Sequence, residues 1–280
     1  MSLENTIREG SKILRDHNIR SHTLDAEVIL SNIMGVTREF LLVNNNLNLS
    51  NEIKFKYKNA ILRRVKNEPV AYIIEAKEFW SKNFNVNRST LVPRPETELM
   101  LYEIIALFKS KSINILDIGT GSGCIILSIL NERKKCYGVA LDISKKALNV
   151  AKFNAKMQQI KNRIKFVNSD IDKFCFGKYD VILSNPPYIK NFDIKYLDKD
   201  ISFFEPKVAL KGGFDGYSTI RTVIDKSKIL MKKKGKLFLE IGNNQTKNVL
   251  QLLKTKGFYI NKIVKNLSKN SRCIISTKIH

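Results

Sequence analysis

The chain has 280 residues, 43% of them hydrophobic, and a formal net charge of +23, which allows one large and one small globular domain. No apolar run is long enough to span a membrane, and the polar N-terminus does not resemble a signal peptide. The four cysteines are scattered without metal-ligand spacing, so we expect reduced thiols, no metal site and a cytoplasmic protein.

The positive charge is concentrated after the first 75 residues. Residues 1–75 carry 11 Lys and Arg against 9 Asp and Glu, whereas residues 76–280 carry 38 against 17, a net charge of +21. So basic a domain predicts weak attraction to nucleic acid or to the ribosome. Compositional drift towards lysine is the alternative, and we favour it for KKKGK (232–236), which we expect at a helix-to-strand turn.

Helical periodicity dominates the first quarter of the chain. Apolar residues recur at helical spacing from residue 3 to about 66, and Gly35 and the stretch NNNLNLS (44–50) mark turns between helices. We therefore predict a small all-helical domain over residues 1–75. Residues 76–92 alternate weakly between apolar and polar side chains, which predicts a β-hairpin linking two domains.

Alternating strands and helices follow over residues 93–280. The expected strands are 113–119, 137–143, 163–170, 179–188 and 236–242, and the expected helices are 124–133, 144–159, 217–233 and 245–256. Two closing strands, 258–265 and 272–279, are separated by a short turn, which predicts antiparallel pairing. The fold class is therefore α/β, with a seven-stranded, mostly parallel sheet between helices. Ligands of such sheets bind at the carboxyl ends of the strands.

A glycine-rich loop, LDIGTGSG (116–123), joins the first of these strands to the helix after it. Gly119, Gly121 and Gly123 allow the backbone to approach a ligand closely and to turn into the helix. Asp142 ends the next strand, 19 residues beyond Gly123, where a carboxylate can accept hydrogen bonds from both ribose hydroxyls of a nucleoside. The loop therefore predicts a ligand that contains a nucleoside.

An acid inside this loop favours a cationic ligand. The spacing is G-x-G-x-G rather than G-x-G-x-x-G, and Asp117 precedes it, which is unfavourable beside a pyrophosphate. S-Adenosylmethionine carries an ammonium and a sulfonium, so Asp117 favours it over a nicotinamide dinucleotide. The alternative is that Asp117 only caps the loop.

The sequence DVILSNPPYIK (180–190) ends a strand on an amide and two prolines. Neither Pro186 nor Pro187 can donate a backbone hydrogen bond, and both fix φ, so the loop presents carbonyl oxygens in a rigid frame. Asn185 Oδ1 and the Pro186 carbonyl can each accept one N–H of a planar nitrogen, and Tyr188 can stack on the group that carries it. A rigid turn without further function is the alternative.

No strong general base is expected beside this loop. His17, His22 and His280 lie far from every motif, and we interpret all three as incidental. Holding a nitrogen in position for attack can by itself supply most of the acceleration. The sequence therefore favours a mechanism that depends on positioning.

Two motifs together resemble known families. LDIGTGSG with its downstream acid resembles the class I S-adenosylmethionine-dependent methyltransferases, and SNPPY (184–188) resembles the subset that methylates planar nitrogens. With EPVAYIIEAKEFW (68–80), PRPETE (93–98), EPKVALKGGFDGYSTIR (205–221) and EIGNNQ (240–245), the chain resembles the PrmC/HemK family over nearly its whole length. The resemblance implies a Rossmann-like fold and methylation of the glutamine amide in the Gly-Gly-Gln loop of class I peptide chain release factors.

The resemblance also implies site residues. The methionine end of S-adenosylmethionine would be surrounded by Gly119, Thr120, Gly121, Ser122 and Gly123, and its ribose bound by Asp142. The acceptor glutamine would be held by Asn185, Pro186, Pro187 and Tyr188, with Asn185 also near the cofactor. Two positions depart from the family pattern. Ile171 replaces the usual aromatic residue beside the adenine, leaving only apolar packing, and Glu75 replaces the usual glycine at the domain junction.

Three functions agree with parts of the sequence. A release-factor glutamine methyltransferase, with residues 1–75 as the docking surface for the protein substrate, agrees with every motif. An N-methyltransferase of RNA or DNA bases would share both loops and use the basic charge, but no nucleic-acid-reading module is recognisable. A catalytically silent RNA- or ribosome-binding protein would not need both loops intact.

Two further segments have open roles. Arg94, Glu96 and Glu98 of PRPETE either cover the cofactor or form a structural ion-pair latch. The glycine-rich loop 212–216 either becomes ordered over the substrate or is simply a turn.

Overall fold

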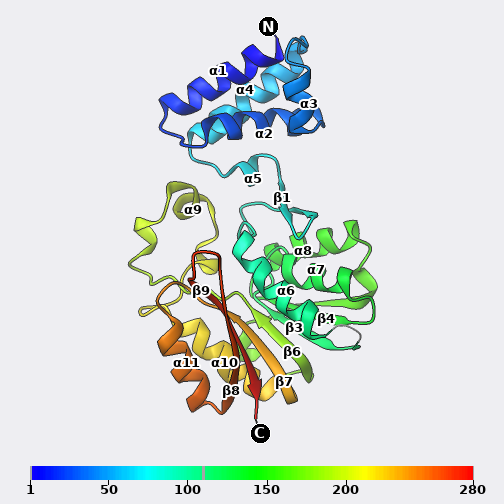
Figure 1. The fold of residues 1–280 in the computed structure, drawn as a ribbon, viewed down its shortest axis with the longest axis vertical. Coiled ribbons are helices and arrows are strands. Elements are labelled where there is room, and N and C mark those ends of the chain that lie inside the picture. Colours follow the sequence, from blue (N-terminus) through cyan, green and yellow to red (C-terminus); the bar gives the residue numbers. More distant parts are fainter. Residues whose placement is uncertain (1, 109–110, 280) are drawn as a thin grey trace. The chain divides into compact units, whose positions relative to one another are not determined.

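The computed structural model describes residues 2–108 and 111–279, so His280 lies outside the described residues. The chain divides into two compact units, one of residues 1–76 with 198–204 and one of residues 77–197 with 205–280. The first is helical and the second contains the large sheet (Figure 1). The predicted α/β fold with a preceding helical domain is confirmed. Within the described residues, no helix is both long and apolar enough to cross a membrane.

The helical unit is built from capped amphipathic helices. Its helices are α1 (Leu3–Asp16), α2 (His22–Met34), α3 (Arg38–Val43), α4 (Asn51–Val65), the short α5 (Val70–Ile73) and, later in the chain, α9 (Lys199–Phe204). The side chains of Ser2 and Ser50 accept backbone N–H bonds at the start of α1 and α4. Gly35, with φ of 66°, ends α2. Leu14 and Ile61 belong to the buried aliphatic core that α1, α2 and α4 share.

A two-stranded hairpin begins the second unit. It consists of β1 (Ala76–Phe79) and β2 (Lys82–Asn85). Trp80 and Ser81 form its turn with φ of 52° and 55°, and the Trp80 amide donates to Glu98 Oε1 at 2.8 Å. Glu75 has φ of 54°, the left-handed region that glycine prefers. A glutamate in this conformation costs about 1 kcal/mol of backbone strain.

The large sheet has seven strands. They are β3 (Asn114–Ile118), β4 (Tyr137–Asp142), β5 (Ile164–Asn168), β6 (Tyr179–Ser184), β7 (Met231–Glu240), β8 (Phe258–Lys265) and β9 (Ser271–Lys278). Their order is β5-β4-β3-β6-β7-β9-β8, and β9 alone runs antiparallel to its neighbours β7 and β8. The chain order reverses direction across the sheet between β3 and β6, which is the place where ligands of such sheets bind.

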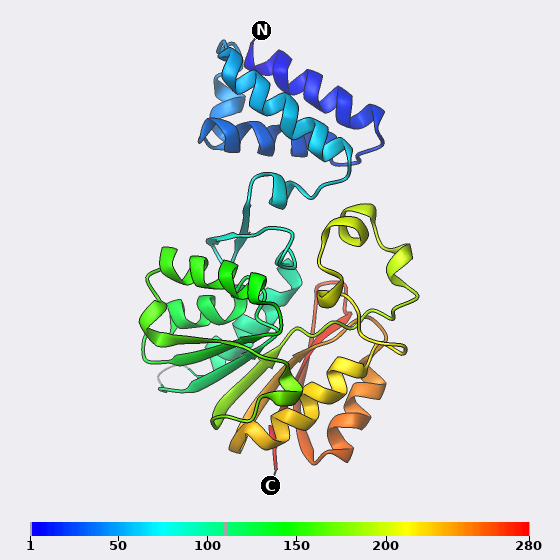
Figure 2. The same cartoon turned by 180° about the vertical axis from the view of Figure 1, so that it is seen from behind.

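Helices cover both faces of this sheet (Figures 1 and 2). One face packs against α6 (Glu98–Leu107), α7 (Cys124–Glu132) and α8 (Lys145–Met157), and the other against α10 (Ser218–Leu230) and α11 (Thr246–Thr255). Short 3-10 turns are η1 (Pro95–Thr97), η2 (Lys161–Arg163), η3 (Ile171–Lys173), η4 (Ile194–Tyr196) and η5 (Lys207–Ala209). Along β3, Ile115 packs into the first layer and Leu116 into the second, as the alternation of a strand requires. Ser144 caps α8 as expected.

One expectation about local structure is wrong. The segment 232–236 is not a helix-to-strand turn, because β7 begins at Met231, directly after α10. The pairing with β6 moves from Tyr179–Met231 to Val181–Lys236, so the lysines form a bulge inside the strand. Buried Met231 anchors the start of the strand, and Lys232 pairs with Asp180 at 2.9 Å.

Candidate active site

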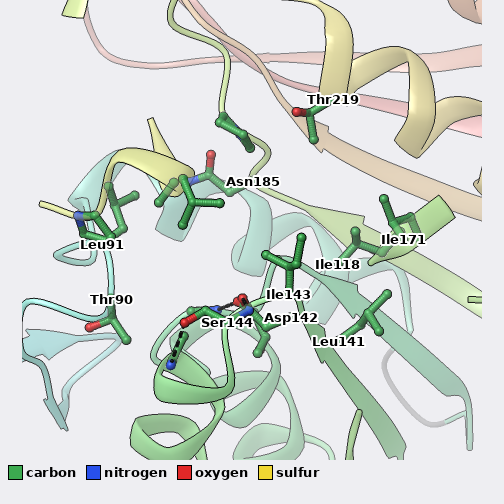
Figure 3. Close-up of a pocket in the computed structure, with 18 of the residues that line it drawn as sticks. Thr90, Leu91, Ile118, Leu141, Asp142, Ile143, Ser144, Ile171, Asn185 and Thr219 are labelled. Carbon is green, nitrogen blue, oxygen red and sulfur yellow. Dashed lines mark hydrogen bonds between the residues drawn. The ribbon is translucent and has the colours of Figure 1, made fainter. Parts of the chain in front are cut away.

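A pocket of about 670 Å³ lies at the carboxyl ends of β3, β4 and β6 (Figure 3). Its wall includes Ile118 at the end of β3, Asp142 at the end of β4 and Asn185 just after β6. Its size is that of a small-molecule site. The sheet topology thus brings the two loops predicted from sequence, which are far apart in the chain, to one pocket.

The glycine loop forms one wall with its backbone. The amides of Gly119 and Thr120 both donate to the Leu141 carbonyl, at 2.9 and 3.0 Å, which folds the loop over β4. Gly119 and Gly121 have φ of 75° and 56°. Apart from their chain neighbours, no heavy atom of the described residues lies within 4 Å of where a Cβ would be. A ligand can therefore approach the backbone closely at these two positions.

Gly123 has a different role from the other loop glycines. It is not among the residues that line the pocket, and it immediately precedes α7 with φ of 80°. A Cβ there would lie 3.0 Å from Leu127 and 3.2 Å from Ala151. Gly123 thus permits close packing of α7 on α8, whereas Thr120 and Ser122 line the pocket with Gly119 and Gly121.

Asp117 lies beneath this loop, is fully buried and is not among the residues that line the pocket, so its role beside a cofactor stays a prediction. Its Oδ2 accepts a hydrogen bond from Thr120 Oγ1 at 2.7 Å, and its Oδ1 has no hydrogen-bond partner among the described residues. Burial raises the pKa of the Asp117 carboxyl to about 7. The Thr120 hydrogen bond and a weaker one from the Ile126 backbone oppose this rise, and the charge of Asp142 reinforces it. An unsatisfied, buried carboxylate oxygen favours a cation nearby.

Asp142 is held in a fixed orientation at the pocket wall. Its Oδ2 accepts from the Gly121 amide at 2.9 Å and its Oδ1 from the Ser144 amide at 2.8 Å. Burial raises the pKa of this carboxyl, and the two amide hydrogen bonds oppose that rise. Each oxygen keeps a second lone pair that can accept a hydroxyl proton.

Aliphatic side chains form the wall on the other side of Asp142. Ile171, the residue predicted beside the adenine, lines the pocket together with Leu141 and Ile143 (Figure 3). Ile143 is 55% exposed although it is large and apolar. Sequence reasoning missed Ile143, and its position directly after the acid that ends β4 was the available signal.

The Asn-Pro-Pro-Tyr loop contributes only part of its length to the pocket. Asn185 and Pro187 line it, whereas Pro186 and Tyr188 are not among the lining residues. The Asn185 side-chain nitrogen donates to Thr97 Oγ1 at 3.4 Å. Thr97 also lines the pocket and was missed from sequence.

Tyr188 is packed between glycines. A Cβ at Gly242 would lie 2.9 Å from its ring, and a Cβ at Gly212 or Gly216 would lie 2.8 Å from its backbone. Gln245 Nε2 donates to the Tyr188 carbonyl at 3.3 Å. Burial raises the pKa of the Tyr188 phenol to about 12. The glycine-rich loop 212–216 thus supports the Asn-Pro-Pro-Tyr loop, and stacking of Tyr188 on an acceptor stays a prediction.

The PRPETE segment makes ion pairs and also borders the pocket. Arg94 lines the pocket and donates to buried Glu205 at 2.6 Å. Glu96 pairs with Arg272 at 2.9 Å. Within the described part of the chain, no group of three or more His, Cys, Asp or Glu residues is placed to hold a metal ion.

Known proteins resemble this chain over both units. Two family models match it, the PrmC N-terminal domain over residues 5–74 and the methyltransferase small domain over residues 96–200. The release factor glutamine methyltransferase of Buchnera aphidicola subsp. Schizaphis graminum is 37% identical over 254 residues, which cover 91% of this chain and 92% of that protein. That of Caulobacter vibrioides is 33% identical, covering 95% and 92%. The chain belongs to the release factor glutamine methyltransferase family. The predicted resemblance to PrmC/HemK proteins is thereby confirmed.

Other relatives are longer or more distant. A bifunctional methyltransferase of Rickettsia conorii is 30% identical over 306 aligned positions, which cover 100% of this chain and 58% of that protein. The chain thus spans little more than half of such relatives. Among solved structures, a methyltransferase from Pyrococcus furiosus gives a TM-score of 0.54 at 19% identity, covering 80% of this chain and all of that one. This likeness shows the fold of a methyltransferase and no more.

The pocket of this family member fits S-adenosylmethionine, the cofactor of class I methyltransferases. Open space above Gly119 and Gly121 can take the methionine end, and the orphaned oxygen of Asp117 suits its cations. Asp142 offers fixed acceptors for a ribose, and the aliphatic wall beyond it can pack against a base.

Replacing Asp142 with asparagine is expected to weaken S-adenosylmethionine binding about 10- to 150-fold. A charge-assisted hydrogen bond contributes ~1.5–3 kcal/mol, and an amide nitrogen would face one of the two donating backbone amides. Isothermal titration calorimetry measures the change. Asp225→Asn, which alters an exposed acid paired with Lys256, is the matched control and should bind normally. Equal affinity of the Asp142 variant and the unchanged chain would contradict this role.

Proposed function

We propose that the chain transfers a methyl group from S-adenosylmethionine to the side-chain amide nitrogen of the glutamine in the Gly-Gly-Gln loop of class I peptide chain release factors. One observation supports this most. The chain aligns nearly end to end with release factor glutamine methyltransferases at up to 37% identity, and its Asn185 amide lies on the wall of the cofactor-sized pocket. Such an enzyme acts where translation takes place, in the cytoplasm.

The pocket residues divide between cofactor and acceptor. Gly119, Thr120, Gly121 and Ser122 hold the methionine end above the buried Asp117, Asp142 binds the ribose, and Ile171 packs against the adenine. When bound, S-adenosylmethionine supplies an electrophilic methyl group on sulfur. The apolar lining excludes water, which favours a transfer that disperses positive charge.

The acceptor amide is activated by position. Its nitrogen is a poor nucleophile because its lone pair is delocalised into the carbonyl. Asn185 Oδ1 and the Pro186 carbonyl each accept one N–H, which holds the nitrogen and directs its lone pair towards the methyl carbon. With the cofactor bound, the nitrogen–carbon bond would form as the sulfur–carbon bond breaks, which leaves a neutral thioether, and the nitrogen would lose one proton when the pocket opens to water. Tyr188 and Pro187 keep this frame rigid.

The helical unit is proposed to dock the release factor. Residues 1–75 are nearly neutral, which suits a protein partner better than nucleic acid. In this scheme residues 76–92 are the linker and residues 93–280 the methyltransferase domain. The net charge of +21 after residue 75 adds weak attraction to the ribosome or nucleic acid. That same charge is the observation that favours a second candidate, methylation of an exocyclic amine of an RNA or DNA base.

A competition between acceptors separates the two functions. The full chain is incubated with S-adenosylmethionine carrying a tritiated methyl group, together with a class I release factor, its Gly-Gly-Gln Gln→Ala variant, bulk RNA and bulk DNA. Incorporation into the intact factor alone is expected. Incorporation into RNA or DNA, or equal labelling of the Gln→Ala variant, would overturn the glutamine assignment.

A further inference from the structure

A buried chain of polar groups lies behind Asn185. Thr97 Oγ1 donates to Glu240 Oε2 at 2.8 Å and accepts from the Asn185 side-chain nitrogen at 3.4 Å. The three residues come from η1, the end of β7 and the loop after β6. Glu240 is 4% exposed and Thr97 is 3% exposed, so water does not compete for these bonds.

The carboxylate of Glu240 determines which groups donate and which accept in this hydrogen-bonded row. An ionised carboxylate only accepts hydrogen bonds, so it takes the single hydroxyl proton of Thr97. The Thr97 oxygen can then only accept from Asn185, which requires the NH2 end of the amide to face Thr97. The orientation of an amide follows from its partners in this way. Asn185 Oδ1 is consequently left to face the pocket.

Glu240 is not explained by an ion pair. Arg272 lowers the pKa of Glu240 through its charge, but the short contacts of the guanidinium are to Glu96 at 2.9 Å and to Asn243 at 2.6 Å. The Thr97 hydroxyl donates to Glu240 at 2.8 Å, and the Asn185 side chain contributes a weaker hydrogen bond to the same carboxyl. Burying a carboxylate this deeply removes its hydration and destabilises the fold unless hydrogen bonds compensate for that loss.

We propose that Glu240 is a positioning residue which, directly and through Thr97, fixes the Asn185 amide with its oxygen towards the acceptor nitrogen. The proposal rests on the proposed function, because it presupposes that Asn185 receives an N–H of the acceptor. With its oxygen facing the pocket, Asn185 can only accept a hydrogen bond there, so the methyl acceptor must carry a donor, as an amide or amine nitrogen does. A carboxylate acceptor would face the Asn185 oxygen with its own oxygens and be repelled.

The charge state of Glu240 provides an independent readout. Burial raises the pKa of this carboxyl to about 7, against the hydrogen bond from Thr97. Around it lie the cation Arg272, the carboxylate Glu96, and the Tyr188, Cys124 and Cys273 side chains, whose pKa values burial raises well above 8. A protonated Glu240 can donate to Thr97 and free the hydroxyl proton for Asn185 Oδ1, which allows the amide to turn over. We therefore expect kcat to rise with pH through about 7.

The test compares Glu240→Gln, Thr97→Val and Thr97→Ser in the full chain, with S-adenosylmethionine and an intact class I release factor. Glu240→Gln keeps the shape of the side chain, but its amide can both donate and accept and so no longer fixes the direction of the hydrogen bonds. We therefore expect kcat to fall about tenfold and its rise near pH 7 to disappear. Thr97→Val removes the hydroxyl that links Glu240 to Asn185 and should lower kcat about 10- to 100-fold. Thr97→Ser restores the hydroxyl and should stay within about threefold of the unchanged chain. The Kd for S-adenosylmethionine should hardly change in any of them.

Glu103→Gln is the matched control, since Glu103 is a partly buried acid of the same unit that pairs with Lys262. It should leave kcat and its pH profile unchanged. If Glu240→Gln and Thr97→Val retain kcat, or lose cofactor affinity as strongly as kcat, the positioning role is overturned.

A second measurement does not depend on activity. The side-chain amide protons of Asn185, followed by NMR in 15N-labelled protein, should be protected from exchange in the unchanged chain and in Thr97→Ser, and less protected in Thr97→Val. If the unchanged chain methylates no release factor, the proposed function fails, and this measurement still decides whether the orientation is imposed. Equal protection in all three proteins would overturn the inference.

Discussion

Replacing Asn185 with alanine is expected to lower kcat for release-factor methylation about 10²–10³-fold, by analogy with the loss of one oriented polar group in other enzymes. The side chain lies on the pocket wall and its nitrogen is engaged by Thr97, so its oxygen is the group available to the acceptor. Without it, only the Pro186 carbonyl remains to hold the nitrogen. Single-turnover methyl transfer with saturating cofactor measures the change directly.

The Asn185→Ala substitution should affect the chemical step and not cofactor binding. Affinity for S-adenosylmethionine, measured by calorimetry, should change by at most about tenfold, the value of one lost hydrogen bond. Asn191→Ala is the matched control, because Asn191 is an exposed asparagine in the same segment that does not line the pocket. A variant at Asn185 that keeps normal kcat would contradict the positioning mechanism.

Replacing Asp117 with asparagine is expected to weaken S-adenosylmethionine binding about 30-fold or more above pH 7, because truncating one partner of a buried charge pair costs ~2–5 kcal/mol. In the unchanged chain the affinity should increase with pH up to about 7. Burial raises the pKa of Asp117 to about 7, and a bound cation lowers it again, so binding below this pH requires release of a proton. Above it the carboxylate is already ionised and the affinity levels off.

Calorimetric titrations between pH 5.5 and 7.5 test this linkage. The whole range lies below the pKa of an α-amino group, which is about 7.7–8.0. Repeating them in buffers of different ionisation enthalpy gives the number of protons released. Asp117→Asn should abolish the proton release, and Asp225→Asn should leave it intact. Affinity that is independent of pH in the unchanged chain would rule out Asp117 as the partner of the cation.

The same raised pKa has a consequence for stability. The folded state retains a proton on Asp117 between its unfolded value near 4 and its folded value of about 7, so the free energy of unfolding falls as pH rises through this window. Glu240 acts with the same sign. The decline with pH of the unfolding temperature of the cofactor-free protein should therefore be smaller in Asp117→Asn.

The local parts of the site could be predicted from sequence because each depends on neighbours in the chain. Gly119, Gly121 and Asp142 follow strands that their own apolar residues define, and the structure places all three at one pocket. The strand-and-helix alternation also predicts the sheet, including the antiparallel pairing of β8 with β9. Periodicity and turn residues are sufficient for these features.

The parts that depend on tertiary packing could not be predicted. Thr97 contacts Asn185 across 88 positions of sequence and Glu240 across 143, and no periodic pattern reports such contacts. Tyr188 is partly buried and packs against glycines from two separate segments, so its exposure to a substrate could not be judged from its own motif. The start of β7 at Met231 was hidden by lysines that form a bulge.

The most direct test of the central claim locates the methyl group itself. The release factor is digested after incubation with the full chain and S-adenosylmethionine, and tandem mass spectrometry assigns the added mass to a residue and side-chain atom. One methyl group on the side-chain nitrogen of the Gly-Gly-Gln glutamine, absent when Asn185→Ala replaces the unchanged chain, is the predicted result. A methyl group on another residue, or none on the factor while RNA or DNA becomes methylated, would contradict the account.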